Sequence, residues 1–414
     1  MEVQWIVKSL LPKILATTYS KTAQLVSHEI GTKKGGNAGD GGFASSTFQM
    51  KINVNIDSKD IEDYVIAKIF PQDPAMRALH NTELQFINET LWYSEIVPAY
   101  KSLELKYKLD LGHLWPKYFG SVETEFAAIA LEDLAKENFK LALPAANLTF
   151  THARLAMEKI AKMHALSYGL AAHDPKKYEE VTSAMQDNRF GGQGDGMDPN
   201  FLRSTAQRGL DPLRLQPEFA NIVEALDKQL EDPISMHRRL LTRHDDSTDV
   251  ICHGDFLRNN VLYKHQGEDV VDACLIDFAT IRVASPGSDL ALFIYMSIDP
   301  KALEGNGLEN LLKVYYTTLE DILDSMDRVR DPWRGSFEDL LNDFGRCAPL
   351  AYSIAAFFLP LMMAPSGAFQ MEDMMEMTPE EQEEQNKNLG GPEATERLVN
   401  MLIDFQKRGF HKCW

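Results

Sequence analysis

The segment His253-Gly254-Asp255-Phe256-Leu257-Arg258-Asn259-Asn260 constrains the fold of this chain more than any other. Three short apolar runs surround it, each typical of a β-strand: Val250–Cys252, Val261–Tyr263 and Ala273–Ile276. Gly254 permits a sharp exit from the first strand, because glycine adopts backbone angles that other residues avoid. The polar turn at residues 265–269 predicts a hairpin between the second and third strands. The pattern therefore predicts that the loop lies close to Asp277, which follows the third strand.

These polar residues form a set suited to phosphoryl transfer. In a kinase-type site the first Asp, here Asp255, takes the proton of the acceptor hydroxyl. Asn260 and Asp277 offer the oxygen ligands that Mg²⁺ prefers, and the metal neutralises charge on the transferring phosphoryl. A lone His-Gly-Asp triplet is a weak signal, and Asp277 alone could cap a turn. The ordered set favours the catalytic interpretation.

A lysine and a glutamate upstream extend this interpretation. Lys68 lies in an apolar run typical of a strand, where a Lys reaches the α- and β-phosphates of a nucleotide if a carboxylate holds it. Glu89 shares a helical face with Phe86 and Tyr93. Singly, a surface Lys and a solvated Glu would be the commoner interpretations. Glu83 competes as the partner, but the aromatic face favours the pair Lys68–Glu89.

A glycine-rich stretch, residues 35–46, precedes the alternating strand predicted over Phe48–Val54. Glycines let backbone N–H groups approach phosphates closely. The stretch matches neither G-x-G-x-x-G nor a Walker sequence, so by itself it indicates only a loop. Its position one strand before Lys68 favours a phosphate-binding role. The residues expected to bind phosphate there are Gly39, Gly41, Gly42 and Ser45.

Together these residues resemble the ecdysteroid kinase-like (CHK kinase-like) family, relatives of choline kinases and aminoglycoside phosphotransferases. The matching pieces are Phe43-Ala44-Ser45, Lys68, Phe86-x-x-Glu89-x-x-x-Tyr93 with Pro98, Leu131–Leu134, Met163–Ser167, His253–Asp255 with Asn259-Asn260, Ile276–Phe278, Ser285-Pro286 and Asp289-Leu290. The resemblance implies an α+β, two-lobed protein-kinase-like fold with a small β-rich N-lobe and a large, mainly helical C-lobe. It also implies transfer of phosphate from ATP, with Mg²⁺, to a hydroxyl of a small molecule.

The resemblance gives a role to each matching residue. Asp255 would be the catalytic base, and Asn260 and Asp277 the metal ligands. Lys68 and Glu89 would be the pair that anchors phosphates.

The resemblance also implies how the chain is divided. Residues 131–135 would be a hinge between an N-lobe, residues 1–130, and a C-lobe, residues 136–414. Backbone atoms near Glu132 and Leu134 would meet adenine there. Asp289 is expected to brace the catalytic loop. His164 lies on a helix rich in Ala and Leu and is expected to be a satisfied core histidine.

Two residues beside the chemistry depart from the family pattern. The family usually has Trp where this chain has Leu257, with Arg258 beside it, and often has Gln where this chain has Ala279. Because of these departures the identity of the acceptor stays undetermined, whereas the reaction class is unaffected. Only eleven residues separate Asp277 from Asp289, too few for the activation segment that a protein substrate normally needs. A small-molecule acceptor is therefore expected.

Three hypotheses about function remain. The first is phosphorylation of an ecdysteroid or another lipophilic alcohol or xenobiotic, the acceptors that the resemblance suggests. The second is a choline- or aminoglycoside-type kinase, whose cationic acceptor needs an acidic or aromatic cage. The third is a non-catalytic nucleotide-binding scaffold, which the presence of all five site residues disfavours.

The length, net charge and cysteine pattern of the chain are typical of a cytoplasmic enzyme. At 414 residues the chain exceeds one core and predicts two lobes. The net charge of −19 argues against nucleic acid and anionic membrane surfaces as partners. Cys252 and Cys274 lie in apolar runs and are expected in the core, and the four cysteines show no zinc or disulfide pattern. The oligomeric state stays open.

The rest of the chain predicts helices and loops. Residues 1–18 lack the pattern of a signal peptide and are expected as an amphipathic helix packed on the small lobe. The longest apolar run, residues 349–364, is short for a membrane span and is expected as a buried helix. Further helices are expected over residues 147–173, 222–230, 234–242, 308–364 and 393–408. A loop is expected at residues 190–197, and a solvated face or mobile loop across the acidic, Met-rich residues 371–388.

Overall fold

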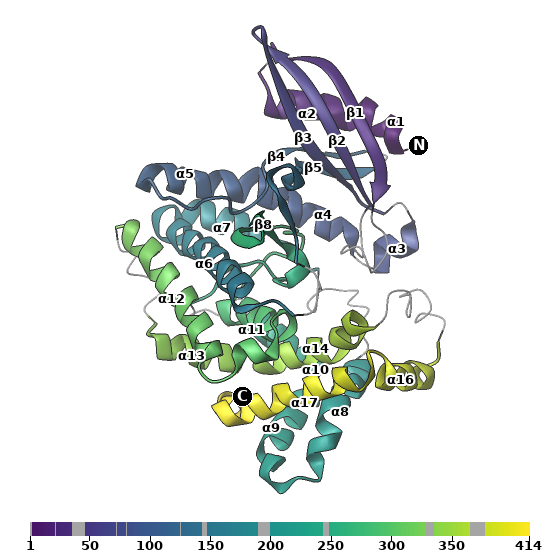
Figure 1. Ribbon diagram of the computed structural model, residues 1–414, viewed down its shortest axis with the longest axis vertical. Helices are drawn as coiled ribbons and strands as arrows, with labels where there is room; N and C mark the ends of the chain where they lie inside the picture. Colours follow the sequence, from purple (N-terminus) through teal and green to yellow (C-terminus); the bar gives the residue numbers. More distant parts are fainter. Residues whose placement is uncertain are drawn as a thin grey trace.

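In the computed structural model the described residues are 2–20, 22–34, 46–71, 73–79, 81–124, 126–142, 147–188, 199–242, 248–327, 335–364 and 377–414. Figure 1 shows two parts, a β-sheet with the N-terminal helices and a larger, mainly helical part. This arrangement is the predicted α+β, two-lobed kinase-like fold.

The smaller lobe is built on a five-stranded antiparallel sheet with the strand order β1-β2-β3-β5-β4. Its strands are β1 (Gln24–Lys34), β2 (Ser46–Ile56), β3 (Lys59–Ile69), β4 (Tyr118–Glu123) and β5 (Ala127–Glu132). Alternate residues of β2 are buried, as its alternating sequence predicts: Phe48, Met50, Ile52 and Val54. The central strand β3 places Lys68 between Thr47 of β2 and Ile129 of β5.

The N-terminal helices cover one face of this sheet (Figure 1). They are α1 (Glu2–Trp5), the π-helical turn η1 (Ile6–Leu10) and α2 (Leu11–Thr18). Their apolar side chains, including Ile6 and Ile14, form one buried cluster with Phe48 and Ala128 of the sheet. The predicted amphipathic helix is therefore confirmed.

A second group of helices lies between the sheet and the larger lobe in Figure 1. It comprises α3 (Pro74–Leu79), α4 (Thr82–Leu91), η3 (Trp92–Ile96) and α5 (Val97–Tyr107). Phe86, Trp92 and Tyr93 belong to the main hydrophobic cluster, which extends through the larger lobe. The face predicted to be apolar therefore points inward and carries Glu89 with it.

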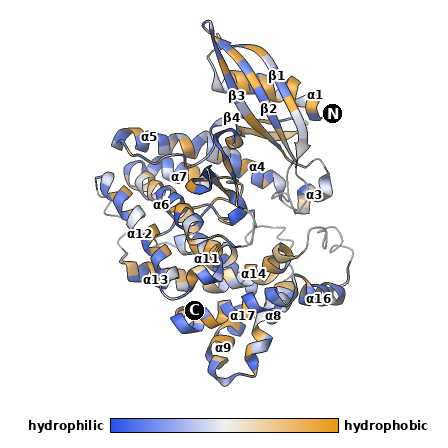
Figure 2. Ribbon diagram, in the orientation of Figure 1, coloured by the Kyte–Doolittle hydropathy of each residue, from blue (hydrophilic) through white to orange (hydrophobic). Residues whose placement is uncertain are grey.

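The larger lobe surrounds two small sheets, one with the order β6-β8-β9 and one that pairs β10 with β7. Its elements are η4 (Leu134–Glu137), β6 (Phe139–Leu141), α6 (Phe150–His173), α7 (Pro175–Ala184), α8 (Pro199–Arg214), η5 (Pro217–Phe219), α9 (Ala220–Leu230), α10 (Pro233–Leu241), β7 (Val250–Cys252), η6 (Arg258–Asn260), β8 (Val261–Gln266), β9 (Asp269–Leu275), β10 (Arg282–Ala284), α11 (Pro286–Ser297), η7 (Pro300–Leu303), α12 (Gly307–Ser325), α13 (Phe337–Arg346), α14 (Ala348–Met363), α16 (Pro379–Asn388), α17 (Gly391–Arg408) and η8 (Phe410–Cys413). Every residue of α11 is buried, and Figure 2 shows apolar residues frequent on α11 and α14. The buried helix predicted near residues 349–364 is thus confirmed as α14.

One predicted helix boundary differs from the observed one, and part of the acidic segment expected as a solvated face or loop is helical. The helix expected from residue 147 begins at Phe150, because the backbone of Leu148 instead bonds to Ser297 O at 2.9 Å and to Asp299 N at 3.1 Å. Residues 379–388 of the acidic segment form the helix α16, whose N-terminus has a capping box between Thr378 and Glu381. Residues 190–197 and 371–376 lie outside the described residues.

Within the described part of the chain, no single helix has both the length and the apolar composition to cross a membrane. Helices α13 and α14 meet these criteria only together, across a bend of 45°.

Candidate active site

The loop His253–Asn260, called the site loop below, leaves β7 through a turn that requires glycine. Gly254 has a φ of +78°, and a Cβ atom added there would lie 2.0 Å from the carbonyl oxygen of Thr280. Ile276 joins the loop to the end of the hairpin: its N–H donates to Asn260 O at 3.0 Å, and its carbonyl lies 3.0 Å from His253 Nε2. The loop and the residue that precedes Asp277 are therefore neighbours, as the hairpin pattern predicts.

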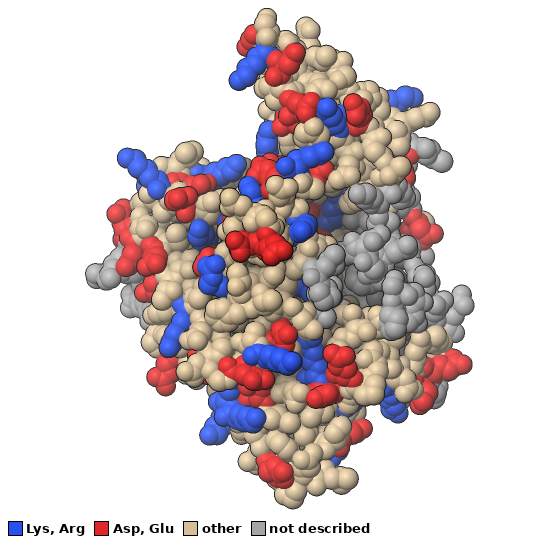
Figure 3. Space-filling model, viewed as in Figure 1, with Lys and Arg blue, Asp and Glu red and all other residues tan. Residues whose placement is uncertain are grey.

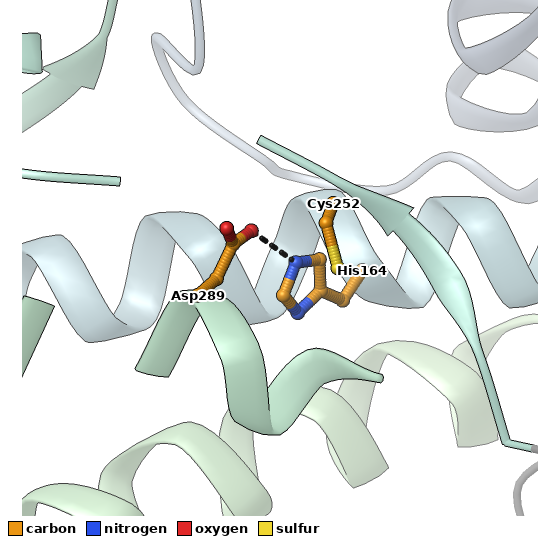
Figure 4. A group of neighbouring side chains, drawn as sticks. All are labelled: His164, Cys252 and Asp289. Atoms are coloured by element: carbon orange, nitrogen blue, oxygen red, sulfur yellow. Dashed lines mark hydrogen bonds and ion pairs between the residues drawn. The ribbon is translucent and has the colours of Figure 1, made fainter. Parts of the chain in front are cut away.

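Asp289, in the first turn of α11, braces the site loop. Its carboxylate accepts the backbone N–H of His253 at 2.7 Å and that of Gly254 at 2.9 Å. His164 Nε2 lies 3.3 Å from the same carboxylate (Figure 4). Its Nδ1 lies 2.9 Å from the Tyr315 hydroxyl. Burial opposes ionisation, but His164 and the Gly254 N–H outweigh it and hold the pKa of Asp289 below its usual value. The expected roles of Asp289 and His164 are both confirmed.

Cys252 completes a buried group of potential metal ligands with His164 and Asp289 (Figure 4). Its thiol lies 3.4 Å from the Ala284 carbonyl oxygen, and burial raises the pKa of Cys252 well above its usual value. The ring nitrogens of His164 and the oxygens of Asp289 already have hydrogen-bond partners. The group therefore fits a hydrogen-bonded brace with a protonated thiol better than a metal centre.

Asp255 and Asn260 lie in contact at the two ends of the site loop. Asn260 Nδ2 donates to the Asp255 carboxylate at 3.0 Å and to its carbonyl oxygen at 2.8 Å. Asn260 Oδ1 accepts from Asn259 Nδ2 at 3.3 Å. Asn260 is 2% exposed, whereas Asp255 is half-buried. The amide is thus oriented by the backbone of the loop, beside a carboxylate that keeps access to solvent.

Lys68 contacts residues from two segments distant from its own strand. Its Nζ lies 2.7 Å from Glu89 Oε2 and 2.8 Å from Asp277 Oδ1. The Glu89 side chain is 1% exposed and that of Asp277 is 41% exposed. Glu83, the competing partner, pairs instead with Arg77 at 2.9 Å. The prediction of a Lys68–Glu89 pair is confirmed, and the contact with Asp277 adds the hairpin to it.

Burial shifts the pKa values of this cluster. Burial of Glu89 is the largest influence on its carboxyl, exceeds the attraction of Lys68, and raises the pKa of Glu89 to about 7. For Lys68 burial acts in the opposite sense, but the charges of Asp277 and Glu89 outweigh it and raise its pKa. Glu89 Oε1 is buried and has no hydrogen-bond partner among the described residues. The lysine is therefore firmly charged, whereas the glutamate titrates near neutral pH.

Asp277 has an unusual backbone geometry, and the residue after it packs against an aromatic ring. Asp277 has a φ of +65°, in a region uncommon for residues with a Cβ. The Phe278 ring stacks on Trp92 with centroids 4.1 Å apart and an interplanar angle of 9°. Trp92 follows α4 directly, so this stack links the residue after Asp277 to the helix that carries Glu89.

Sequence inspection did not single out Asn88, which precedes Glu89. Its buried amide pairs with the backbone of Gln186 in both directions, each at 2.8 Å, and Nδ2 lies 3.3 Å from the Ala279 carbonyl oxygen. These contacts tie α4 to two segments of the larger lobe. The only sequence signal is a polar residue beside an apolar helical face, because every partner comes from a remote part of the chain.

The predicted hinge lies at the end of β5. The Glu132 carboxylate accepts the Lys117 N–H at 3.0 Å and lies 3.2 Å from His113 Nε2, and His113 is the main cause of its lowered pKa. Leu134 is 2% exposed and packs with Phe139. Both side chains thus have local roles, and a contact between the hinge backbone and adenine stays a prediction. Gly39, Gly41, Gly42 and Ser45 lie outside the described residues.

Comparisons with solved structures give matches of low identity. A GDP complex of wild-type aminoglycoside 2'-phosphotransferase-IIIa has 11% identity and a TM-score of 0.38, covering 95% of this chain and 98% of its own. Glucosamine kinase in complex with glucosamine, ADP and inorganic phosphate has 10% identity and a TM-score of 0.32, covering 95% of this chain and 96% of its own. Among curated proteins none matches significantly.

The sequence profile of the ecdysteroid kinase-like family matches residues 39–328, which include Lys68, Glu89, Asp255, Asn260 and Asp277. The chain therefore belongs to the ecdysteroid kinase-like family.

Proposed function

We propose that the protein is an ATP- and Mg²⁺-dependent kinase that phosphorylates a hydroxyl of a small molecule, an ecdysteroid or another lipophilic alcohol or xenobiotic. The observation that supports this most is the contact of Lys68 with both Glu89 and Asp277. It joins the central strand of the small lobe, α4 and the hairpin of the large lobe at one point. In a kinase these are the parts that meet at the phosphates of the nucleotide.

Each residue would have a distinct part in the reaction. Lys68, held by Glu89, would bind the phosphates of the nucleotide. Asp255 would orient the acceptor hydroxyl and take its proton, and its contact with the Asn260 amide keeps its carboxylate in place. The half-buried position of Asp255 leaves it accessible to an acceptor.

The donor set suits the implied cation. Asp277 and Asn260 offer carboxylate and amide oxygens, the ligands that a hard cation such as Mg²⁺ prefers, and the Asp277 side chain is 41% exposed. Bound Mg²⁺ would neutralise charge on the transferring phosphoryl group. Because Asp277 already contacts Lys68, the same carboxylate would set the distance between the phosphate-binding lysine and the metal.

Substitution of the two carboxylates tests this proposal. We expect Asp255→Asn to lower turnover by about 10²–10⁴-fold, because a general base is lost, while the Kd of Mg-ATP changes little. We expect Asp277→Asn to weaken nucleotide binding in the presence of Mg²⁺ but not in EDTA. Product is measured by mass spectrometry with ecdysteroids, choline, aminoglycosides and phenolic glycosides as acceptors. Nucleotide binding is measured by calorimetry with ATP and GTP.

Asp269→Asn is a matched control, because Asp269 is an exposed carboxylate of the same hairpin, at the first position of β9. Full turnover of Asp255→Asn on an identified acceptor would show that Asp255 is not the base. A wild-type protein that binds neither nucleotide would contradict the proposal as a whole. Product with choline or an aminoglycoside alone would favour the second kind of kinase.

A further inference from the structure

Arg258 is a buried cation in the middle of the site loop. Its backbone N–H donates to the Ser297 hydroxyl at 3.0 Å, at the C-terminal end of α11. The residue is 9% exposed. Among the described residues, its Nε and Nη1 atoms are buried and have no hydrogen-bond partner. Two of the three guanidinium nitrogens are therefore removed from water without a hydrogen bond from the described residues to replace it.

A second buried arginine adds to the positive charge at this place. Arg397 of α17 is 6% exposed and donates to Asn147 Oδ1 and to the Ile298 carbonyl oxygen, each at 2.9 Å. Both of these acceptors are neutral. Because Ile298 follows Ser297, the two arginines contact the same end of α11, one from the site loop and one from α17.

Both guanidinium groups keep their charge at neutral pH. Burial, followed by repulsion from Arg397, lowers the pKa of Arg258 to about 10. Burial also lowers the pKa of Arg397, although Asp299 and Glu393 oppose this. A pKa of about 10 still leaves Arg258 protonated at pH 7.

The surroundings of Arg258 differ from those of the cations on the molecular surface. On the face shown in Figure 3, Lys and Arg side chains lie among Asp and Glu side chains. Buried arginines are normally paired with carboxylates, because an uncompensated charge in a protein interior is costly. An anion that is not among the described residues would therefore stabilise the buried charge of Arg258.

We infer that Arg258 and Arg397 form an anion-binding subsite between the site loop and α17, which takes a carboxylate, sulfate or phosphate group. Arginine suits this chemistry, because its fixed donors bind oxyanions through more than one hydrogen bond. The anion could be carried by the acceptor or be free in solution, and the two sources share the same recognition. If the acceptor carries it, the subsite lies three residues from Asp255 in sequence and would select acceptors that are anionic at one end; this part rests on the proposed function.

Anion titration without nucleotide tests the subsite itself. Binding of sodium sulfate and sodium phosphate is measured by calorimetry and by thermal unfolding, against sodium chloride at equal ionic strength. We expect wild type to bind one anion and Arg258→Gln to bind it at least about tenfold more weakly, since hydrogen bonds to a charged donor are lost. Arg258→Lys keeps the charge and should keep part of the affinity. This variant therefore distinguishes loss of the charge from misfolding of Arg258→Gln.

Two further variants separate this subsite from other effects. Arg154→Gln removes a 39% exposed arginine that pairs with Glu158, and it should bind the anion as wild type does. Lys68→Met removes the proposed phosphate-binding lysine of the nucleotide site and should also keep the subsite. Wild type without anion binding, or Arg258→Gln with the affinity of wild type, would overturn the inference.

Kinetics then distinguish the two sources of the anion. A selective rise of about tenfold or more in the KM of Arg258→Gln for acceptors that carry a carboxylate or sulfate, compared with their neutral parents, identifies the acceptor as the source. An unchanged KM together with the loss of anion titration identifies a free anion. If the proposed kinase function is wrong, the protein will not bind nucleotide. The anion titration is done without nucleotide, so it still tests the subsite.

Discussion

Lys68 and Arg258 are two buried or nearly buried cations of the proposed site, and their surroundings differ. Lys68 contacts two carboxylates, Glu89 and Asp277, and these raise its pKa. Arg258 faces a second arginine, and burial with this repulsion lowers its pKa. Burial lowers both pKa values, but the net shifts are opposite, because the carboxylates beside Lys68 outweigh burial, whereas the charge that acts on Arg258 is that of a second arginine.

Lys68 is paired within the fold, whereas Arg258 is proposed to gain its counter-charge from a bound anion. The lysine cluster links three segments through ion pairs that are complete within the chain, so it holds the two lobes in register. The side chain of Arg258 has no such ion pair among the described residues. We expect variants of the two cations to respond differently, and the predictions below, which include the titration of Glu89 beside Lys68, run from the largest expected effect to the smallest.

The largest effect is expected for Lys68→Met. Removing the lysine leaves Glu89 buried at 1% exposure without its partner, and we expect a loss of about 3 kcal/mol in the free energy of unfolding at pH 8. The double variant Lys68→Met/Glu89→Gln should recover part of this loss, because it removes the stranded carboxylate as well. Urea denaturation measures both. A single variant as stable as wild type would show that the ion pair does not join the lobes.

An effect of similar size at most is expected from titration of Glu89. Its folded pKa of about 7 lies above the ordinary value of 4.5, so the folded protein binds the proton more tightly. The contribution of Glu89 to stability is therefore fully present below pH 4.5 and is lost as pH rises through 7. We expect the stability of wild type relative to Glu89→Gln to fall by up to about 3 kcal/mol between pH 4.5 and 8.

The contribution of Glu89 to nucleotide binding should increase with pH, whereas its contribution to stability decreases. Only the ionised Glu89 carboxylate pairs fully with Lys68, so nucleotide affinity should rise between pH 6 and 8 in wild type and stay flat in Glu89→Gln. If nucleotide affinity rises with pH equally in wild type and in Glu89→Gln, a group other than Glu89 is responsible for the pH dependence. The affinity for Mg-ATP, measured by calorimetry across this range, decides between these outcomes.

The smallest effect is expected for Arg258→Met in buffer free of sulfate and phosphate. Methionine fills similar space without a charge, so we expect the free energy of unfolding to change by less than about 1 kcal/mol, or to increase. Added sulfate should then favour wild type over the variant. If Arg258→Met costs as much stability as Lys68→Met, the arginine has a partner within the fold and the contrast fails.

Much of the site was predictable because it depends on local spacing. The strand, loop and hairpin around Asp255 follow from short apolar runs and a polar turn, and Gly254 is needed at a turn where a Cβ would lie 2.0 Å from a carbonyl oxygen. The choice of Glu89 over Glu83 followed from the side of the helix on which aromatic residues lie. The start of α6 was placed too early, because the backbone of Leu148 pairs with a segment about 150 residues away.

The sequence by itself determined the order of the polar residues, the elements that carry them and the chemistry for which they are suited. Only the tertiary structure decided which charges are compensated. The contact of Lys68 with Asp277, the pairing of Asn88 with Gln186 and the proximity of Arg258 to Arg397 each join residues about 100 or more positions apart. Burial and counter-charge depend on what distant segments bring to one place, and periodicity and spacing along the chain do not contain that information.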